Sequence, residues 1–152
     1  MISNQVGEPW VSIERLINRW GKNRVMPKRV IQSPKLPKPG GPYSVAVESG
    51  GFVFVSGQVA LDRATGEVSG KSVAEQTRTV LENIKTILEE AGLSLRDAVK
   101  VNVYLSDIQH FNEMNEVYRQ YFPESQPART TVQATLAKKE YLIEVDVIAH
   151  RG

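Results

Sequence analysis

The stretch "SVAEQTRTVLENIKTILEEAG" (residues 72–92) gives the strongest structural signal in the chain, because it marks both ends of one amphipathic helix. Ser72 and Glu75 have the spacing of a capping box, in which each side chain bonds to the backbone of the other. Gly92 stands where a left-handed C-terminal cap belongs. The apolar residues between them recur at helical spacing, at Val73, Val80, Leu81, Ile84, Ile87, Leu88 and Ala91. A helix with one such stripe must pack against a sheet or another helix.

The segments around this helix indicate strands, because they are rich in β-branched and aromatic residues and several alternate apolar with polar positions. The predicted strands are residues 29–32, 43–49, 52–60, 97–107, 128–136 and 141–150. Gly50-Gly51 has the signature of a two-residue hairpin. A second helix is predicted at about residues 108–122. The order strand-strand-strand-helix-strand-helix-strand-strand predicts an α+β domain with two helices on one face of the sheet.

Composition excludes several classes of function. The chain has 152 residues, no cysteine and two histidines, so thiolate chemistry, disulfides and a protein-bound transition metal are not expected. No run approaches the roughly 18 apolar residues that a membrane span needs. Residues 1–40 hold eight Lys or Arg against two acids, whereas residues 41–152 hold eleven against fifteen. The acidic body argues against a nucleic-acid partner.

Residues 1–27 are predicted to be an extension of a domain formed by residues 28–152. Their apolar residues have helical spacing, at Trp10, Ile13, Leu16, Ile17 and Trp20. A short amphipathic helix, a targeting presequence and a start codon assigned upstream of Met26 all remain open, although Glu8 and Glu14 argue against a presequence. Because no secretory signal is evident, a cytoplasmic location is predicted, with organellar targeting left open.

The segment "QPARTTV" (126–132) places a charged residue, Arg129, in a predicted strand. A guanidinium carries five donors and keeps its charge, so it is either solvated or binds an anion. Alternation in the last strand puts Glu144 on the face opposite Ile143 and Val145. We therefore expect Arg129 and Glu144 to share the face away from the helices, if their strands are neighbours. Such a mixed face suits a homo-oligomer interface with polar clefts.

Several segments in the right order resemble the reactive-intermediate deaminases of the RidA (YjgF) type. The segments are "GGPYSVAV", "FVFVSGQVALD", "TGE", "AEQTRTVLENIKTILEEAG", "VKVNVYLSD", "FNEMNEVY" and "PARTTV…LIEVDVIA", within residues 28–151. The resemblance implies a chorismate-mutase-like fold that assembles as a homotrimer with clefts between subunits. It also implies hydrolysis of 2-imino acids, such as 2-iminobutanoate and 2-iminopropanoate, or of their enamine tautomers, to 2-oxo acids and ammonia, without cofactor or metal.

The resemblance assigns catalytic roles to three residues. Arg129 would hold the substrate carboxylate by a bidentate pair. Glu144 would orient or activate the attacking water, or carry a proton. Tyr43 of "GPYS" would line the cleft with its hydroxyl near the reacting nitrogen.

Four further residues are implied in substrate binding. Gly57 of "SGQ" would contribute backbone groups, with Ser56 beside it. Asn115 of "MNEVY" is the polar helix residue that such proteins place near the cleft. Thr131 stands where many relatives have cysteine, so this chain keeps a small polar group but lacks the thiol.

Two other functions are compatible with the same residues. A non-catalytic trimer could bind 2-oxo acids in the cleft without turnover. Some relatives carry endoribonuclease or translation-inhibitor labels, but an acidic body without a base-stacking platform argues against RNA.

Overall fold

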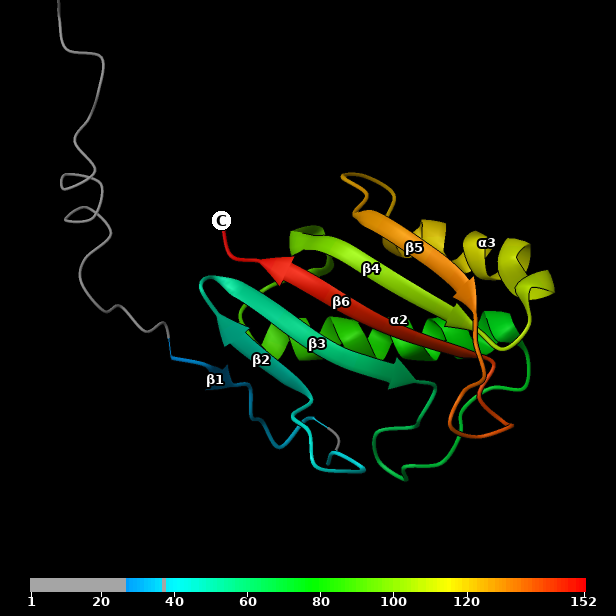
Figure 1. The fold of residues 1–152 in the computed structure, drawn as a ribbon, viewed down its shortest axis with the longest axis horizontal. Coiled ribbons are helices and arrows are strands. Elements are labelled where there is room, and N and C mark those ends of the chain that lie inside the picture. The colour runs from blue at the N-terminus through cyan, green and yellow to red at the C-terminus, as the bar shows by residue number, and fades with distance from the viewer. Residues whose placement is uncertain (1–26, 37) are drawn as a thin grey trace, which may run out of the picture.

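The computed structural model describes residues 27–36 and 38–152, so the predicted helix at Trp10–Trp20 lies outside the described residues. The described part has the predicted order of strands and helices (Figure 1). The strands are β1 (Arg29–Val30), β2 (Ala46–Ser49), β3 (Phe52–Val59), β4 (Ala98–Leu105), β5 (Ala128–Gln133) and β6 (Ile143–His150). The helices are α2 (Val73–Glu90), α3 (Phe111–Tyr121) and the 3₁₀ turns η1 (Leu95–Asp97) and η2 (Ile108–His110).

The six strands form one mixed sheet in the order β1-β2-β3-β6-β4-β5. All neighbouring strands are antiparallel except β4 and β5, which run parallel because α3 connects them. Figure 1 shows α2 and α3 on the same side of the sheet, and no helix within residues 27–36 and 38–152 covers the opposite face. We call this opposite side the open face. The predicted α+β class is confirmed, and no described helix has the length and apolar character needed to span a bilayer.

The structure contains the helix cap and the hairpin turn that the sequence predicts. Ser72 accepts a hydrogen bond from the backbone of Glu75, and the Glu75 carboxylate accepts one from the backbone of Ser72, which completes the capping box. Gly50 and Gly51 have φ values of 61° and 83°, the left-handed conformation that a two-residue hairpin of this kind requires. These positions fix where β3 and α2 begin.

The core lies between the sheet and α2. Alternate residues of β6 point into it, and Ile143, Val145, Val147 and Ala149 are at most 1% exposed. The prediction for this strand is therefore confirmed. The residues between them point to the open face and are only half-buried.

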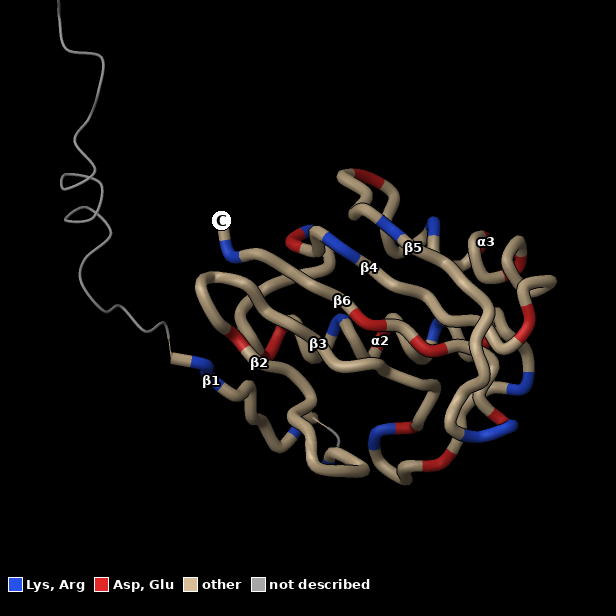
Figure 2. The backbone as a smooth tube through the Cα atoms, in the orientation of Figure 1, with Lys and Arg blue, Asp and Glu red and all other residues tan. Residues whose placement is uncertain are grey.

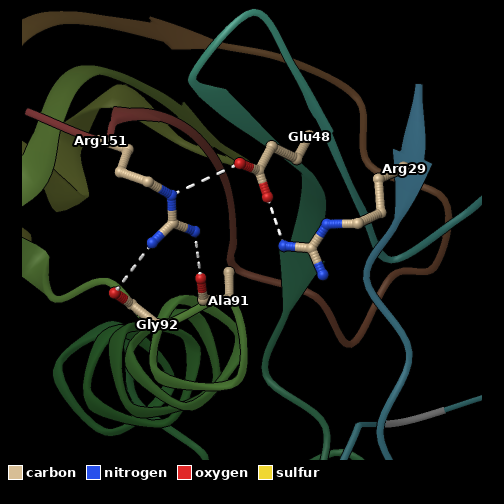
Figure 3. A network of polar contacts seen from close by, with 5 residues as sticks. All are labelled: Arg29, Glu48, Ala91, Gly92 and Arg151. Carbon is tan, nitrogen blue, oxygen red and sulfur yellow. Dashed lines mark hydrogen bonds and ion pairs between the residues drawn. The ribbon is translucent and has the colours of Figure 1, made fainter. Parts of the chain in front are cut away.

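Arg151, just after β6, connects the sheet to the C-terminal end of α2 (Figure 3). Its guanidinium donates to the carbonyl oxygens of Ala91 and Gly92, and its Nε donates to Glu48 on β2 at 3.4 Å. The last turn of α2 contains no basic residue, so Arg151 supplies the positive charge that the negative end of the helix dipole favours. Arg29 on β1 donates to the same Glu48 carboxylate, and this hydrogen bond is the largest cause of a lowered Glu48 pKa.

We expect Arg151→Gln to lower the melting temperature by about 2–4 °C, because the helix end and Glu48 lose a shared cation worth about 1 kcal/mol. The folded-state pKa of Glu48 lies below the unfolded value, so this contribution is present above the unfolded pKa and is lost on acidification through the folded pKa. The difference in melting temperature between wild type and variant should therefore narrow on acidification, whereas the part that comes from the hydrogen bonds of Arg151 to Ala91 and Gly92 should remain. Arg78→Gln, at an exposed arginine in the middle of α2, is the matched control. Equal losses in both variants would contradict the role of Arg151.

Candidate functional site

Arg129 lies on the helix-covered side of the sheet, so the prediction that it lies on the open face is wrong. β5 pairs with β4 in parallel register, with Arg129 beside Val101 and Thr131 beside Val103. Both valines are buried under the helices, at no more than 1% exposure. Residues paired across adjacent strands point to the same face, so Arg129 and Thr131 point toward α3. They share a face as predicted, but it is the opposite one.

Glu144 lies on the open face and is not next to Arg129. β6 is flanked by β3 and β4, and β4 separates it from β5. Glu144 pairs with Tyr104, and Tyr104 pairs with Val132, which is three residues along β5 from Arg129. The two positions are thus separated by roughly 10 Å across the strands and roughly 10 Å along them, on opposite faces. One protomer cannot bring both side chains to the same small molecule.

Arg129 lies in a groove between α3 and the start of β5. The groove has a volume of about 320 Å³ and is lined by Asn115, Tyr118, Arg119, Gln126, Pro127 and Arg129. The guanidinium carbon of Arg129 lies 4.5 Å from the ring centroid of Tyr118 and 5.7 Å from that of Phe111. The ion pairs between described residues do not involve Arg129. Its donors are therefore available to an anion in the groove, and Asn115 lies at the same groove.

Two buried hydroxyls flank this arginine without a hydrogen-bond partner among the described residues. They are Tyr118 Oη on α3 and Thr131 Oγ1 on β5. Burial raises the pKa of Tyr118 to about 12, and the nearby charge of Arg129 only partly opposes this shift. Tyr118 is consequently a neutral phenol at physiological pH.

Glu144 belongs to a second group of residues, around an irregularity of β3. The register between β3 and β6 shifts between Val55 and Gln58, and Gly57 lies at this shift. A Cβ on Gly57 would lie 2.1 Å from Glu144 Oε1, so the carboxyl group occupies space that only glycine leaves open. Burial raises the pKa of Glu144, and the charge of Asp146 raises it further. This carboxyl group therefore takes up a proton nearer to neutral pH than an ordinary one.

Ser56 precedes Gly57 at the β3 irregularity, and Tyr43 precedes Ser44, to which Ser56 is hydrogen-bonded. The Ser56 hydroxyl donates to the carbonyl oxygen of Ser44 at 2.7 Å, which holds the segment after Tyr43 beside the β3 irregularity. The Tyr43 side chain is 52% exposed. The predicted site residues thus lie in two separate groups, which we name half-site A and half-site B. Half-site A contains Asn115, Arg129 and Thr131, and half-site B contains Tyr43, Ser56, Gly57 and Glu144.

A polar network beside Glu144 was missed by sequence reasoning. Asp146 accepts hydrogen bonds from Asn102 Nδ2 at 2.8 Å and from the Tyr104 hydroxyl at 3.1 Å. Figure 2 shows the acidic positions of β6 in the middle of the sheet. Alternation in residues 98–105 was a usable signal, because it places Asn102 and Tyr104 opposite the buried valines. Within residues 27–36 and 38–152, no group of three or more His, Asp or Glu could hold a metal ion.

The mixed six-stranded sheet with two helices on one face defines the class as a chorismate-mutase-like α+β domain. The family model described as Endoribonuclease L-PSP matches residues 33–151. The chain belongs to this family, which includes the Rid, YjgF and RutC proteins.

Individual relatives span the same domain. A RutC family protein of Pyrococcus abyssi is 53% identical over 126 residues, which cover 83% of this chain and 99% of the relative. The 2-iminobutanoate/2-iminopropanoate deaminase of Homo sapiens is 38% identical over 125 residues, covering 82% and 91% of the two chains. The crystal structure of E. coli TdcF with bound serine is 38% identical with a TM-score of 0.75, covering 82% and 99%.

We expect Gly57→Ala to fold but to displace the Glu144 carboxyl group, because the atom in its way is the end of a flexible side chain. The displaced carboxyl group becomes better hydrated, so its pKa should fall toward the ordinary value. A carbon-detected NMR titration of Glu144 measures this shift. Gly40→Ala is the control, because its Cβ would make only an ordinary contact of 3.7 Å with the Tyr43 hydroxyl. An unchanged Glu144 titration in Gly57→Ala would show that Gly57 does not set the position of the carboxyl group.

Proposed function

We propose that this protein is a deaminase that hydrolyses small 2-imino acids, such as 2-iminobutanoate and 2-iminopropanoate, to 2-oxo acids and ammonia. Water adds to the C=N carbon, a proton passes to the nitrogen, and the resulting carbinolamine collapses to a C=O group with loss of ammonia. The protein has to hold the carboxylate, place one water molecule and move protons, which positioned side chains can do without a cofactor.

The observation that carries the proposal is Arg129, a guanidinium in an open groove without an acidic partner among the described residues. The groove is lined by cationic and neutral groups, so it favours an anion. A carboxylate fits the guanidinium in the bidentate geometry that a lysine cannot offer. The bound serine in TdcF and the activity named for the human relative both concern small molecules with a carboxylate, which supports this choice.

Glu144 is the proposed base. Its raised pKa makes it a stronger proton acceptor than an exposed carboxylate, so it can take a proton from water as the water attacks the imine carbon. The same group can return that proton to the departing nitrogen. We propose that Tyr43 and the backbone at Gly57 line the space around the imine.

The separation of the half-sites supports a site formed between two copies of the chain. We propose a homotrimer in which half-site A of one subunit faces half-site B of the next. The open face exposes large apolar side chains, with Phe52 at 39%, Phe54 at 41% and Val132 at 41%. Burial of such groups favours association of copies through this face.

A binding function without turnover is the second candidate, because the groove at Arg129 contains the carboxylate-binding groups without Glu144. It predicts that small 2-oxo acids raise the melting temperature while imines are not consumed. An endoribonuclease activity is less well supported, because residues 41–152 carry eleven basic against fifteen acidic residues.

We expect Arg129→Ala to lower kcat/KM about a hundredfold or more, since a desolvated charge pair of this kind contributes about 3 kcal/mol. Arg129→Lys should lose most of the same activity, because a point charge cannot replace the bidentate fork. The assay is release of 2-oxobutanoate or pyruvate from an imine generated in situ. Arg96→Ala, at an exposed arginine in η1, is the control and should behave as wild type. Equal rates for wild type and Arg129→Ala would refute the carboxylate assignment.

We expect Arg129→Ala and Glu144→Gln to complement each other if each site uses two subunits. Either variant alone has three defective sites in a trimer. In randomly mixed trimers, about one quarter of the sites combine an intact Arg129 with an intact Glu144 from different subunits. Co-refolding at equal concentrations should therefore restore about one quarter of wild-type activity.

Two results of this mixing experiment would contradict the shared site. Activity that stays at the level of the single variants in mixed oligomers would place both residues in one subunit's site or outside it. Recovery without subunit mixing, verified with an affinity tag on one variant, would indicate that the residual activity comes from one variant alone.

A further inference from the structure

We propose that Tyr118 is a positioning residue for Arg129, and that its ring, with that of Phe111, forms an aromatic platform that holds the guanidinium ready for the carboxylate. This inference rests on the proposed function, since it concerns the same groove. It assigns a role to two residues of α3 that the mechanism above does not use.

The aromatic platform consists of two rings of α3 that both lie close to the Arg129 guanidinium. Phe111 and Tyr118 are seven residues apart, two turns of α3, so they lie on the same face of the helix. Their ring centroids lie 5.7 Å and 4.5 Å from the guanidinium carbon of Arg129. Both distances are within the range of about 6 Å in which a ring face attracts a cation.

Tyr118 is itself held in place. It is 7% exposed, and its ring stacks on Phe122 with centroids 4.5 Å apart. A half-buried cation on the helix-covered side of a sheet would be unfavourable without a partner. The fixed ring provides that partner.

An aromatic partner leaves the positive charge and the N–H donors of Arg129 free, whereas a carboxylate partner would occupy them. An acidic partner would accept the N–H donors and neutralise the charge, so an incoming substrate would have to compete with it. A ring attracts the cation through its π-electrons and keeps the net positive charge. Because Tyr118 stays a neutral phenol, with its pKa raised by burial to about 12, no phenolate forms to pair with the guanidinium.

The Tyr118 hydroxyl is not required for this role. Tyr118 Oη is buried and has no hydrogen-bond partner among the described residues. Removing an unsatisfied buried hydroxyl is neutral or stabilising. The ring and the hydroxyl can therefore be separated by substitution.

The experiment compares Tyr118→Leu and Tyr118→Phe with Tyr121→Leu. Tyr121 lies on the same helix, and its hydroxyl donates to Glu82 on α2, so it controls for loss of a tyrosine from α3. Binding of pyruvate and 2-oxobutanoate is measured by calorimetry, and turnover by the imine assay. We expect Tyr118→Leu to raise Kd and KM about fivefold or more with kcat within about twofold. We expect Tyr118→Phe to match wild type in Kd, and Tyr121→Leu to lower the melting temperature without changing Kd.

A second measurement needs no ligand. The side-chain protons of Arg129 should show ring-current shifts in NMR spectra of the wild type and Tyr118→Phe, and these shifts should be clearly smaller in Tyr118→Leu, where only the more distant Phe111 ring remains. Arg129→Lys identifies the resonances. Lack of ring-current shifts in the wild type would overturn the platform itself. A wild-type Kd in Tyr118→Leu, with binding lost in Arg129→Ala, would overturn the positioning role while leaving the proposed function intact. Failure of the wild type to bind any 2-oxo acid, with the shifts present, would instead refute the proposed function.

Discussion

The parallel pairing of β4 with β5 is the constraint on which the site depends. Val101 and Val103 are buried beneath the helices, and the register places Arg129 and Thr131 directly beside them. Because α3 connects the two strands, its aromatic residues lie where the first residues of β5 point. A charged residue is tolerated there because ring faces and an open groove surround it. A shift of one residue in this register would turn Arg129 to the open face and remove it from the groove.

A second consequence is that one chain holds two incomplete half-sites. Half-site A has the cation and no base, whereas half-site B has a carboxyl group with a raised pKa and no cation beside it. The raised pKa of Glu144 comes from its burial and from the charge of Asp146. In the homotrimer that we propose, another copy would supply the half-site that each chain holds elsewhere. The apolar side chains on the open face provide a physical reason for copies to associate.

The sequence was sufficient to predict the order of elements, the capping box at Ser72 and the hairpin at Gly50-Gly51, since each depends on local chemistry. It also predicted the buried side of β6, where one face is uniformly apolar and the other contains Glu144 and Asp146. It failed for β5, because alternation divides a strand into two sets without saying which set is covered. In an edge strand next to a short helix, Val132 can be 41% exposed while Arg129 is half-buried. The deciding facts, the β4–β5 register and the position of α3, are tertiary.

Gly57 shows how backbone geometry can control an acid–base group. The β3 irregularity and the missing side chain allow the Glu144 carboxyl group to lie against the strand, where it loses hydration. Asp146 adds a negative charge next to it and accepts hydrogen bonds from Asn102 and Tyr104. Burial and this neighbouring charge both raise the pKa of Glu144, and the proposed attack of water on an imine needs a proton acceptor of this kind.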